Sequence, residues 1–416
     1  MNYSTNAQAH LTIDGVDAVT LADTYGTPLY VYDVSKIRQT MRAFKAIFER
    51  EAVPYVVSYA SKAFSTKAIY QVAQQEGIHA DIVSGGELYT ALAAGFPAAH
   101  LSFNGNNKSW DELTMAVRAG VGTIIVDNFL ELQWLSEIAA AHQVQQAVLL
   151  RISPGISAHT HEFISTGQQD SKFGFDLLTG QAKRAYEIAR LDTNLDLRGL
   201  HAHIGSQIFD VTGFEKNAAL LADTAHSWGW TPAVINVGGG FGIRYTDDDT
   251  PLPESDYAAA IIATLKAKAE AFAWPLPEIW IEPGRSIVGP AGQTLYTIGS
   301  RKDIPDLRQH KHRYKVTCAS THHKQVEDLM GTEVFMFRIE NWHFQCIDNT
   351  ADRIDDASCE KPSESRFGQC VKDLGECQHT QPPHADVDYR RKPLRAGDPA
   401  GFHDDSDQCH APYQDT

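Results

Sequence analysis

The residues of this sequence that could do chemistry are a lysine, a histidine, a glutamate, an arginine and a glycine-rich loop. Lys62 follows the apolar, β-branched stretch 55–60 (YVVSYA), which has the composition of a buried strand. A lysine amine in a largely desolvated site can form a Schiff base with a carbonyl group. The alternative is that the strand ends in solvent and that Lys62 simply lies in water.

The other candidates also have two interpretations each. The stretch 238–242 (GGGFG) exposes backbone N–H groups with no Cβ in the way, which suits an anion such as phosphate but also suits a tight turn. His203 could lie flat against an aromatic ring or be a buried histidine with satisfied hydrogen bonds. Glu282 could keep a pyridine nitrogen protonated or form an ion pair with Arg285. Taken together, the amine, the anion loop, the flat ring and the acid match the requirements of pyridoxal 5'-phosphate (PLP).

Short apolar runs alternate with longer helix-like segments from residue 28 to about residue 290. After an opening run at 28–33 (PLYVYD), the predicted strands are 54–60, 78–83, 100–105, 123–128, 147–153, 197–205, 233–239 and 278–284. The segments between them, such as 84–95 and 129–142, have apolar residues at helical spacing. Apolar strands that alternate with helices are typical of a parallel sheet covered on both faces. The pattern predicts an α/β fold, a (β/α)₈ TIM-type barrel, with an open doubly wound sheet as the alternative.

Polar and glycine-rich clusters follow the predicted strands, and nearly all of them begin where a strand ends. In chain order they are Lys62, 84–87 (SGGE), 104–109 (NGNNKS), Asp127-Asn128, 153–155 (SPG), His203 with 205–207 (GSQ), 238–242 and 282–285 (EPGR). In a barrel, the carboxyl ends of all strands open on one face, where active sites lie. We therefore expect Lys62 to share one mouth with His203, Glu282 and Arg285.

Composition limits the partners and divides the chain. The 416 residues carry a formal net charge of −16, which argues against nucleic acid or an anionic membrane as a partner. The N-terminus shows no signal-peptide pattern, and no apolar run is long enough to span a bilayer, so a cytoplasmic location is expected.

The chain changes character near residue 306, and all six cysteines lie after residue 305. We predict three segments: 1–27, which precedes the barrel and has the pattern of a strand and a short helix; 28–305, the barrel; and 306–416, an atypical tail with one convincing strand at 334–339.

A series of motifs, in order and spacing, resembles diaminopimelate decarboxylase, a fold-type III PLP enzyme of lysine biosynthesis. The motifs are SYASKAF (58–64), DIVSGGEL (81–88), FNGNNKS (103–109), LRISPGI (150–156), HTHEFISTGQQDSKFGF (159–175), GLHAHIGSQI (199–208), GGGFG (238–242) and EPGRSIVG (282–289). The resemblance covers about residues 10–305. It implies PLP-dependent decarboxylation of meso-2,6-diaminopimelate to L-lysine and CO₂ by a homodimer. The stretch 159–175 resembles the diaminopimelate branch more than the ornithine or arginine decarboxylases.

The resemblance also implies a role for each candidate residue. Lys62 would carry the cofactor, His203 would stack on its pyridine face and Glu282 would keep its ring nitrogen protonated, so these three form the implied catalytic set. Arg285 would contact a carboxylate of the amino-acid substrate. No metal is implied. The implied cofactor-binding set is Lys62, His203, Ser206, Gly238, Gly239, Gly240, Glu282, Pro283, Gly284 and Arg285.

The resemblance stops at about residue 305. The family continues with a β-domain that bears a DGG strand, an Arg and a Tyr that contact substrate, and a CESGD motif whose Cys acts across the dimer interface. None of these is found in 306–416, and GECQH (375–379) is not that motif, so we expect an out-of-frame, disordered or replaced tail. Two alternatives for the function stay open: a PLP-binding barrel that is catalytically impaired, and a decarboxylase of another basic amino acid. Without a C-x-x-C pair, no zinc site is predicted from the neighbouring residues Cys370, Cys377, His379 and His384.

Overall fold

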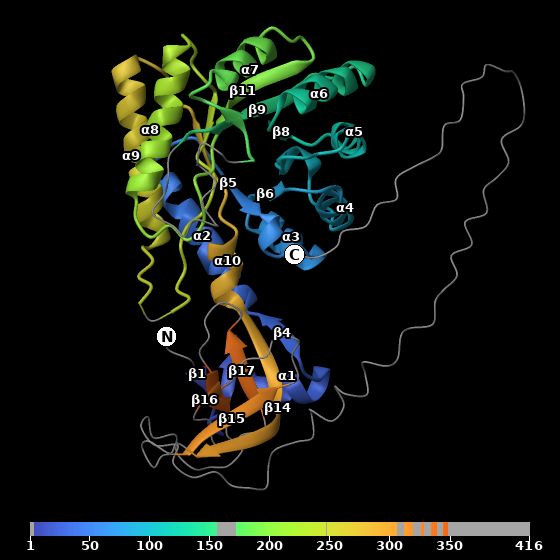
Figure 1. Ribbon diagram of the computed structural model, residues 1–416, viewed down its shortest axis with the longest axis vertical. Helices are drawn as coiled ribbons and strands as arrows, with labels where there is room; N and C mark the ends of the chain where they lie inside the picture. The colour runs from blue at the N-terminus through green and yellow to red at the C-terminus, as the bar shows by residue number, and fades with distance from the viewer. Residues whose placement is uncertain are drawn as a thin grey trace, which may run out of the picture. The chain divides into compact units, whose positions relative to one another are not determined.

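The structure is a computed structural model that describes residues 4–155, 172–246 and 248–297, together with the backbone of 298–305 and of four later strands (Figure 1). Its largest part is a closed parallel barrel, which confirms the predicted (β/α)₈ fold class. Each barrel strand overlaps one of the predicted runs. The barrel strands are β5 Tyr55–Ala60, β6 His79–Ile82, β7 Leu101–Phe103, β8 Thr123–Val126, β9 Gln146–Ser153, β11 Leu195–His201, β12 Val234–Asn236 and β13 Glu278–Ile281.

The barrel closes in chain order. Each barrel strand pairs in parallel with the next, and β13 pairs with β5, so the ring has no free edge. A two-residue strand, β10 Phe175–Asp176, pairs with β9 outside the ring. Because parallel neighbours need a crossover, the chain must leave the sheet after every strand and return to the same end.

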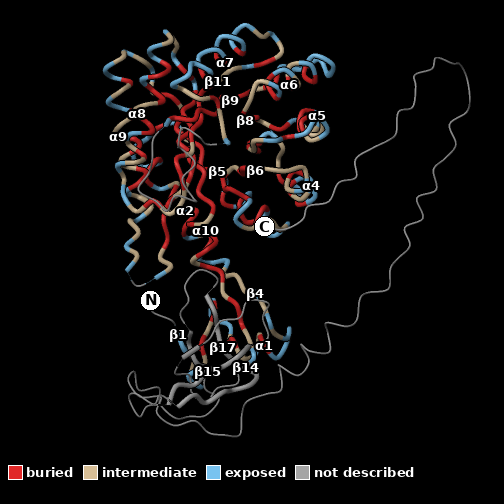
Figure 2. Tube along the Cα trace, viewed as in Figure 1, coloured by how far each residue is buried: buried red, intermediate tan, exposed pale blue. Residues whose placement is uncertain are grey.

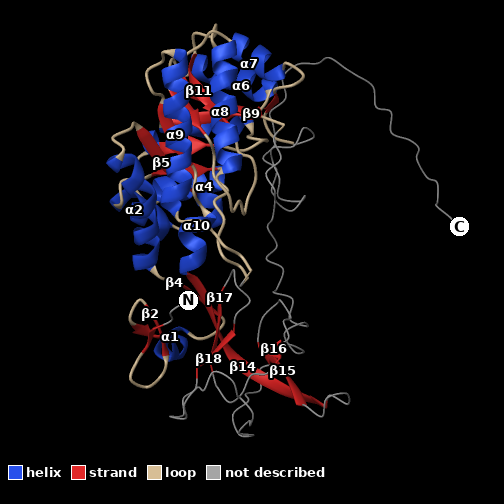
Figure 3. Cartoon of the chain, turned by 90° about the vertical axis from the view of Figure 1, so that its left-hand side faces the viewer, coloured by secondary structure: helices blue, strands red, loops and turns tan. Residues whose placement is uncertain are grey.

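Helices make most of these crossovers and surround the strands (Figure 3). Local sequence sets where several of them begin: Ser109 caps its helix in a capping box with Glu112, and the Asn128 side chain accepts from the backbone N–H of Glu131. Short 3₁₀ turns lie at η1 Ser61–Ala63, η2 Ala98–His100 and η4 Gly289–Ala291. The helices are α2 Val34–Arg50, α3 Lys67–Gln75, α4 Gly85–Ala93, α5 Trp110–Ala119, α6 Phe129–Ala141, α7 Gln181–Ala189, α8 Thr212–Ser227, α9 Glu254–Phe272 and α10 Arg285–Val288.

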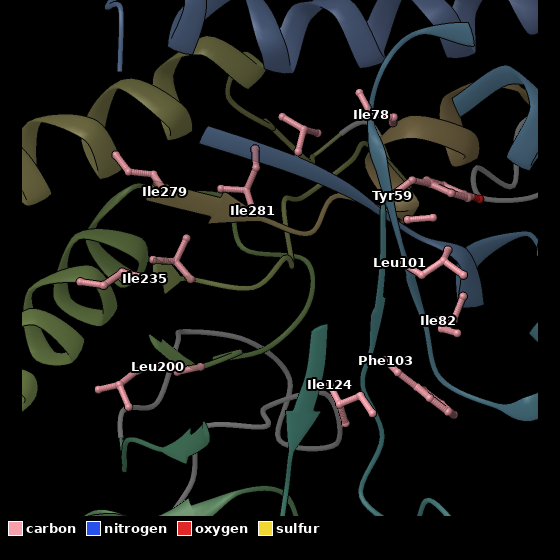
Figure 4. Packing of buried hydrophobic residues seen from close by; sticks show 14 of the residues in the cluster. Tyr59, Ile78, Ile82, Leu101, Phe103, Ile124, Leu200, Ile235, Ile279 and Ile281 are labelled. Carbon is pink, nitrogen blue, oxygen red and sulfur yellow. The ribbon is translucent and has the colours of Figure 1, made fainter. Parts of the chain in front are cut away.

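One set of alternate strand residues packs outward against the helices. Buried residues concentrate along the barrel strands (Figure 2). Figure 4 shows part of this outer cluster, in which Tyr59, Leu200 and Ile281 are all buried. Successive strand residues point to opposite faces, so the residues between these must point into the barrel.

The inward residues form two layers of opposite character. One is a separate apolar cluster that consists of Val56, Ile125, Leu149, Val234 and Trp280. The residue two positions after each of these is polar and buried. The five polar residues, which lie at or just beyond the carboxyl ends of the same strands, are Ser58, Asp127, Arg151, Asn236 and Glu282. The interior of the barrel is thus filled by apolar side chains towards the amino ends of these strands. Towards their carboxyl ends it is lined with hydrogen-bonding groups.

Two smaller sheets lie outside the barrel's hydrogen-bonded ring. The first contains β1 Ser4–Thr5, β2 Leu11–Ile13 and β3 Val16–Asp17, and leads into α1 Ala18–Tyr25, which Asp17 caps. The second has the order β16-β15-β14-β17-β18, with β4 also paired to β14. Its strands are β4 Leu29–Tyr32, β14 Gly292–Pro305, β15 His312–Cys318, β16 Val326–Glu327, β17 Val334–Arg338 and β18 Phe344–Ile347.

The first and last strands within the segment 28–305, β4 and β14, lie outside the barrel ring. Strands β4 and β14 pair antiparallel, with Leu29 opposite Leu295, so both ends of that segment belong to the second sheet. Leu29 and Val31 pack with Leu295 in a small cluster of their own, whereas Tyr30 between them is exposed. This alternation is typical of an antiparallel sheet with one covered face, not of a doubly covered barrel strand.

The region after residue 305 gives one confirmed strand and leaves most of the tail untested. The run predicted at 334–339 is strand β17, while β15 and β18 were not predicted. The three-segment division stays a prediction, and the cluster of cysteines and histidines near residue 380 lies outside the described residues. Within the described part, no helix is long and apolar enough to cross a membrane, and no group of three or more His, Cys, Asp or Glu side chains could hold a metal ion.

Candidate active site

A cavity of about 460 Å³ opens where β5, β11 and β13 end. Gly238 and Pro283 lie beside it: a Cβ on Gly238 would meet His203 Cα at 3.0 Å, and the Pro283 carbonyl accepts from the backbone N–H of Ala60 at 3.0 Å. The fold therefore brings the predicted site residues together, and their individual roles stay predictions. The predicted residues that line the cavity are Lys62, His203, Ser206, Gly239, Gly240, Glu282, Gly284 and Arg285.

Lys62 lies in the 3₁₀ turn η1, directly after β5. The buried Ser61 beside it fixes this turn, because its hydroxyl lies 2.8 Å from both the Asp81 carbonyl and Glu87 Oε2. Lys62 lines the cavity and is exposed. The reason is its place just beyond the last buried strand residue, where the turn carries it to the cavity mouth.

His203 is fixed in one orientation by the glycine loop. Its Nδ1 accepts a hydrogen bond of 3.1 Å from the backbone N–H of Gly239, so the ring proton is on Nε2. Burial lowers the pKa of His203 well below its usual value, and the positive charges of Lys62 and Arg151 lower it further. A neutral ring of fixed orientation at the cavity wall fits the predicted stacking role.

The glycine loop packs so closely against neighbouring backbone that a side chain has no room at Gly239 or Gly240. A Cβ on Gly239 would lie 2.1 Å from the Glu282 carbonyl oxygen, and one on Gly240 would lie 2.2 Å from the Gly205 carbonyl oxygen. Gly240 also has φ +107°, which disfavours any side chain. With Ser206 beside them, these residues form a cradle at the cavity wall that fits the phosphate of the predicted cofactor.

Glu282 faces the cavity as an ionised carboxylate. Its Oε1 accepts from Asn236 Nδ2 at 2.7 Å and from Asn104 Nδ2 at 3.2 Å, and its Oε2 lies 3.2 Å from His201 Nε2. Burial by itself would raise the pKa of Glu282, but the charge that His201 gains at low pH and the hydrogen bonds from His201 and Asn236 outweigh it and lower the pKa to about 2.

A second carboxyl, Asp81, lies next to Glu282 inside the barrel. Asp81 is 2 % exposed, and its Oδ1 accepts from Asn104 Nδ2 at 2.8 Å, so one amide group links the two acids. Burial and the charge of Glu282 raise the pKa of Asp81 well above its usual value. The pair therefore carries one negative charge, on Glu282, because two buried neighbouring carboxyls do not both ionise.

Four members of this network, Asp81, Asn104, His201 and Asn236, were not among the predicted site residues. The sequence does contain a signal for two of them. His201 and Asn236 are the last residues of β11 and β12, and each precedes a predicted site residue, His203 or Gly238, by two positions. Polar residues at inward positions of otherwise apolar strands would have indicated the network.

Arg285, the first residue of α10, is half-buried at the cavity. Its guanidinium carbon lies 5.4 Å from the centre of the Tyr245 ring, which also lines the cavity. The Tyr245 backbone N–H donates to Asp249 Oδ2 at 2.8 Å, which fixes that loop. Arg285 thus lines the cavity, and its contact with a substrate carboxylate stays a prediction. Most of the predicted motif 159–175 lies outside the described residues.

A parallel barrel with a lysine after its first strand, a glycine cradle and a buried acid defines the class of pyridoxal-binding barrels. Residues 34–289 match the pyridoxal binding domain of the pyridoxal-dependent decarboxylases. The chain is 53 % identical to diaminopimelate decarboxylase of Bacillus methanolicus over 309 residues, which cover 73 % of this chain and 72 % of the relative. It is 52 % identical to the enzyme of Bacillus subtilis (strain 168), with coverage of 73 % and 70 %. The chain belongs to the diaminopimelate decarboxylase family.

Solved structures agree with this assignment. The crystal structure of diaminopimelate decarboxylase from M. jannaschii in complex with L-lysine superposes with a TM-score of 0.69 at 33 % identity, covering 76 % of this chain and 73 % of that one. The Helicobacter pylori enzyme, also in complex with L-lysine, gives a TM-score of 0.64 at 30 % identity and coverage of 72 % and 73 %.

Proposed function

We propose that this protein removes CO₂ from meso-2,6-diaminopimelate to give L-lysine, the last step of lysine biosynthesis, with PLP as its cofactor. The observation that carries the proposal is the ionised Glu282, which faces the same cavity as the Lys62 amine, the neutral His203 and the glycine cradle. The relatives named diaminopimelate decarboxylase support the choice of substrate.

The residues present fit PLP. Lys62 would hold it through its amine, and Ser206 with the loop 238–240 would hold its phosphate. When bound, the cofactor supplies a conjugated ring that takes up the electron pair left by the departing carboxylate. Glu282 would keep a proton on the ring nitrogen, and Arg285 would bind a carboxylate of the substrate that does not react.

His203 would offer the cofactor a flat surface for stacking and no charge. Its imidazole is neutral and is held by Gly239, so it would press a flat, uncharged face against the ring. A neutral neighbour leaves Glu282 as the charged group that faces the ring nitrogen. This arrangement favours loss of CO₂ because the protonated nitrogen strengthens the electron sink.

The cradle gives a prediction on cofactor affinity. We expect Gly240→Ala to weaken PLP binding roughly 10²-fold, because its Cβ would lie 2.2 Å from the Gly205 carbonyl oxygen and the loop would have to move. The matched control is Gly229→Ala: Gly229 also has positive φ, +67°, but has open space around it, so this variant should lose only about 1–2 kcal/mol of stability. Absorbance titration with PLP and urea unfolding measure the two effects. Equal affinity in the two variants contradicts the placement of the phosphate.

The substrate is tested directly with the purified, PLP-loaded chain. We expect CO₂ release and L-lysine formation from meso-2,6-diaminopimelate, and much slower release from ornithine, arginine and lysine. Faster release from one of those three would favour the decarboxylase of another basic amino acid. Binding of PLP without turnover of any of them would favour the catalytically impaired barrel.

The proposal extends to assembly, location and the tail. We propose a homodimer in the cytoplasm, in line with the biosynthetic relatives, and a region after residue 305 that differs from the β-domain of the family. The aligned 309 residues, out of 416, support the last point. Fusing a family-like C-terminal third after Ile304 should raise CO₂ release. Full activity of the unaltered chain would contradict a replaced domain.

A further inference from the structure

His201 is a buried histidine that contacts the acid of the site and not the cavity. It is the last residue of β11, is 1 % exposed, and places Nε2 3.2 Å from Glu282 Oε2. His203, two residues later, lies beyond the end of the strand and lines the cavity. His201 therefore reaches the site through Glu282.

The environment of His201 sets its protonation state. Its Nδ1 is buried and has no hydrogen-bond partner in the described part of the chain. If Nδ1 carried a proton, a buried N–H would lack an acceptor, whereas a bare Nδ1 leaves only an unused lone pair. Burial also lowers the pKa of His201, which favours the same neutral form of the ring. The ring is thus neutral, with its proton on Nε2, and it donates to Glu282.

Near neutral pH, the side chains of the described residues that donate to Glu282 are therefore uncharged. Asn236 and Asn104 donate through amide groups, and His201 donates through an uncharged ring. Arg151 and Lys108 are buried cations, but each has another partner. Arg151 Nε lies 3.8 Å from Asp127 Oδ1 with its guanidinium over Phe173, and Lys108 Nζ lies 2.8 Å from Glu131 Oε1. The titratable groups that act electrostatically on His201 from the surrounding elements are Glu282, Arg151, Lys62, Asp127 and His203.

This arrangement keeps the carboxylate both fixed and charged. A positively charged His201 would offset the negative charge of Glu282. Glu282 would then no longer favour a protonated ring nitrogen. An apolar side chain there would leave Oε2 without its donor and free to rotate. A neutral donor avoids both outcomes.

We propose that His201 is a positioning residue: as a neutral Nε2–H donor it holds the Glu282 carboxylate towards the ring nitrogen of the cofactor without cancelling its charge. The inference rests on the proposed function, because it needs a pyridine ring in the cavity. It assigns His201 a task separate from the stacking predicted for His203, two residues further on.

The test separates positioning from simple packing with two ligands, PLP and 1-deazapyridoxal 5'-phosphate, which has carbon in place of the ring nitrogen. Wild-type protein should bind PLP more tightly than the deaza analogue, because Glu282 acts only on the nitrogen. His201→Phe removes the donor and should reduce this preference about tenfold, the usual scale for loss of an outer partner. His201→Gln, whose amide can donate in the same place, should keep the preference. Absorbance titration measures all affinities.

The matched control is His79→Phe. His79 lies at the start of β6, stacks on His100 at 4.5 Å between ring centroids, and does not line the cavity. This variant should leave the preference unchanged.

If His201→Phe weakens the binding of both ligands equally, or if His201→Gln loses the preference as fully as His201→Phe, the proposal is overturned. His201→Leu, smaller and equally without a donor, replaces the Phe variant if that one does not fold. Failure of wild-type protein to bind PLP at all would overturn the proposed function instead.

Discussion

Replacing Lys62 by alanine is expected to abolish covalent attachment of PLP and to lower CO₂ release roughly 10³-fold or more, the scale of losing a covalent catalytic group. The residue lines the cavity and is exposed at its mouth, so the substitution removes an amine without opening a hole in the core. The fold should therefore survive, and thermal unfolding of the cofactor-free protein should change little. This makes the loss of function attributable to the amine.

Two further variants sharpen that result. Lys62→Arg keeps the positive charge but cannot form the Schiff base, so it should be as inactive as Lys62→Ala. Lys67→Ala removes an exposed lysine from the start of α3, outside the cavity, and should behave like the wild type. Borohydride reduction of the PLP-loaded protein followed by peptide mapping identifies the attached lysine. A label on any lysine other than Lys62 contradicts the assignment of the site.

The barrel and the mouth of its site could be predicted from the sequence because both depend on local patterns. Apolar strand runs that alternate with helices indicate the fold, and a parallel barrel brings all strand ends to one face. Lys62, His203 and Glu282 each lie at or just beyond a strand end, so they were found together. The sequence left open whether Lys62 would be buried or exposed, since this depends on the direction of the turn η1.

Three members of the inner network were missed because they lie within strands and not after them. Asp81, His201 and Asn236 each occupy an inward position between apolar neighbours, and a short apolar run conceals a single polar residue. Their meaning depends on contacts between distant strands, such as that of Asn104 with Glu282, 178 residues apart. The sheet of β4 and β14 was missed for the same reason: its pairing joins residues near 30 and near 295.

Glu282→Gln is expected to lower kcat about 10²–10³-fold with little change in KM, the scale of losing one preorganised charge or donor at the reacting group. The amide lacks the charge that would keep the ring nitrogen protonated, while Arg285 would still bind the substrate carboxylate. In addition, an amide cannot accept from every donor that surrounds Glu282, so one of His201, Asn104 or Asn236 would lose its partner.

The pH dependence of the cofactor-free protein provides an independent measurement of the same carboxylate. The pKa of Glu282 in the fold is about 2, below the ordinary 4.5, so its contribution to stability is complete above about pH 4.5 and is lost as the pH falls towards 2. The difference in unfolding free energy between wild type and Glu282→Gln should therefore shrink on acidification. The control is Glu278→Gln at the other end of β13, where the carboxylate accepts from Trp280 Nε1 at 2.7 Å. If Glu278→Gln lowers kcat as much as Glu282→Gln, the loss reflects damage to β13 and the electrostatic role of Glu282 is wrong.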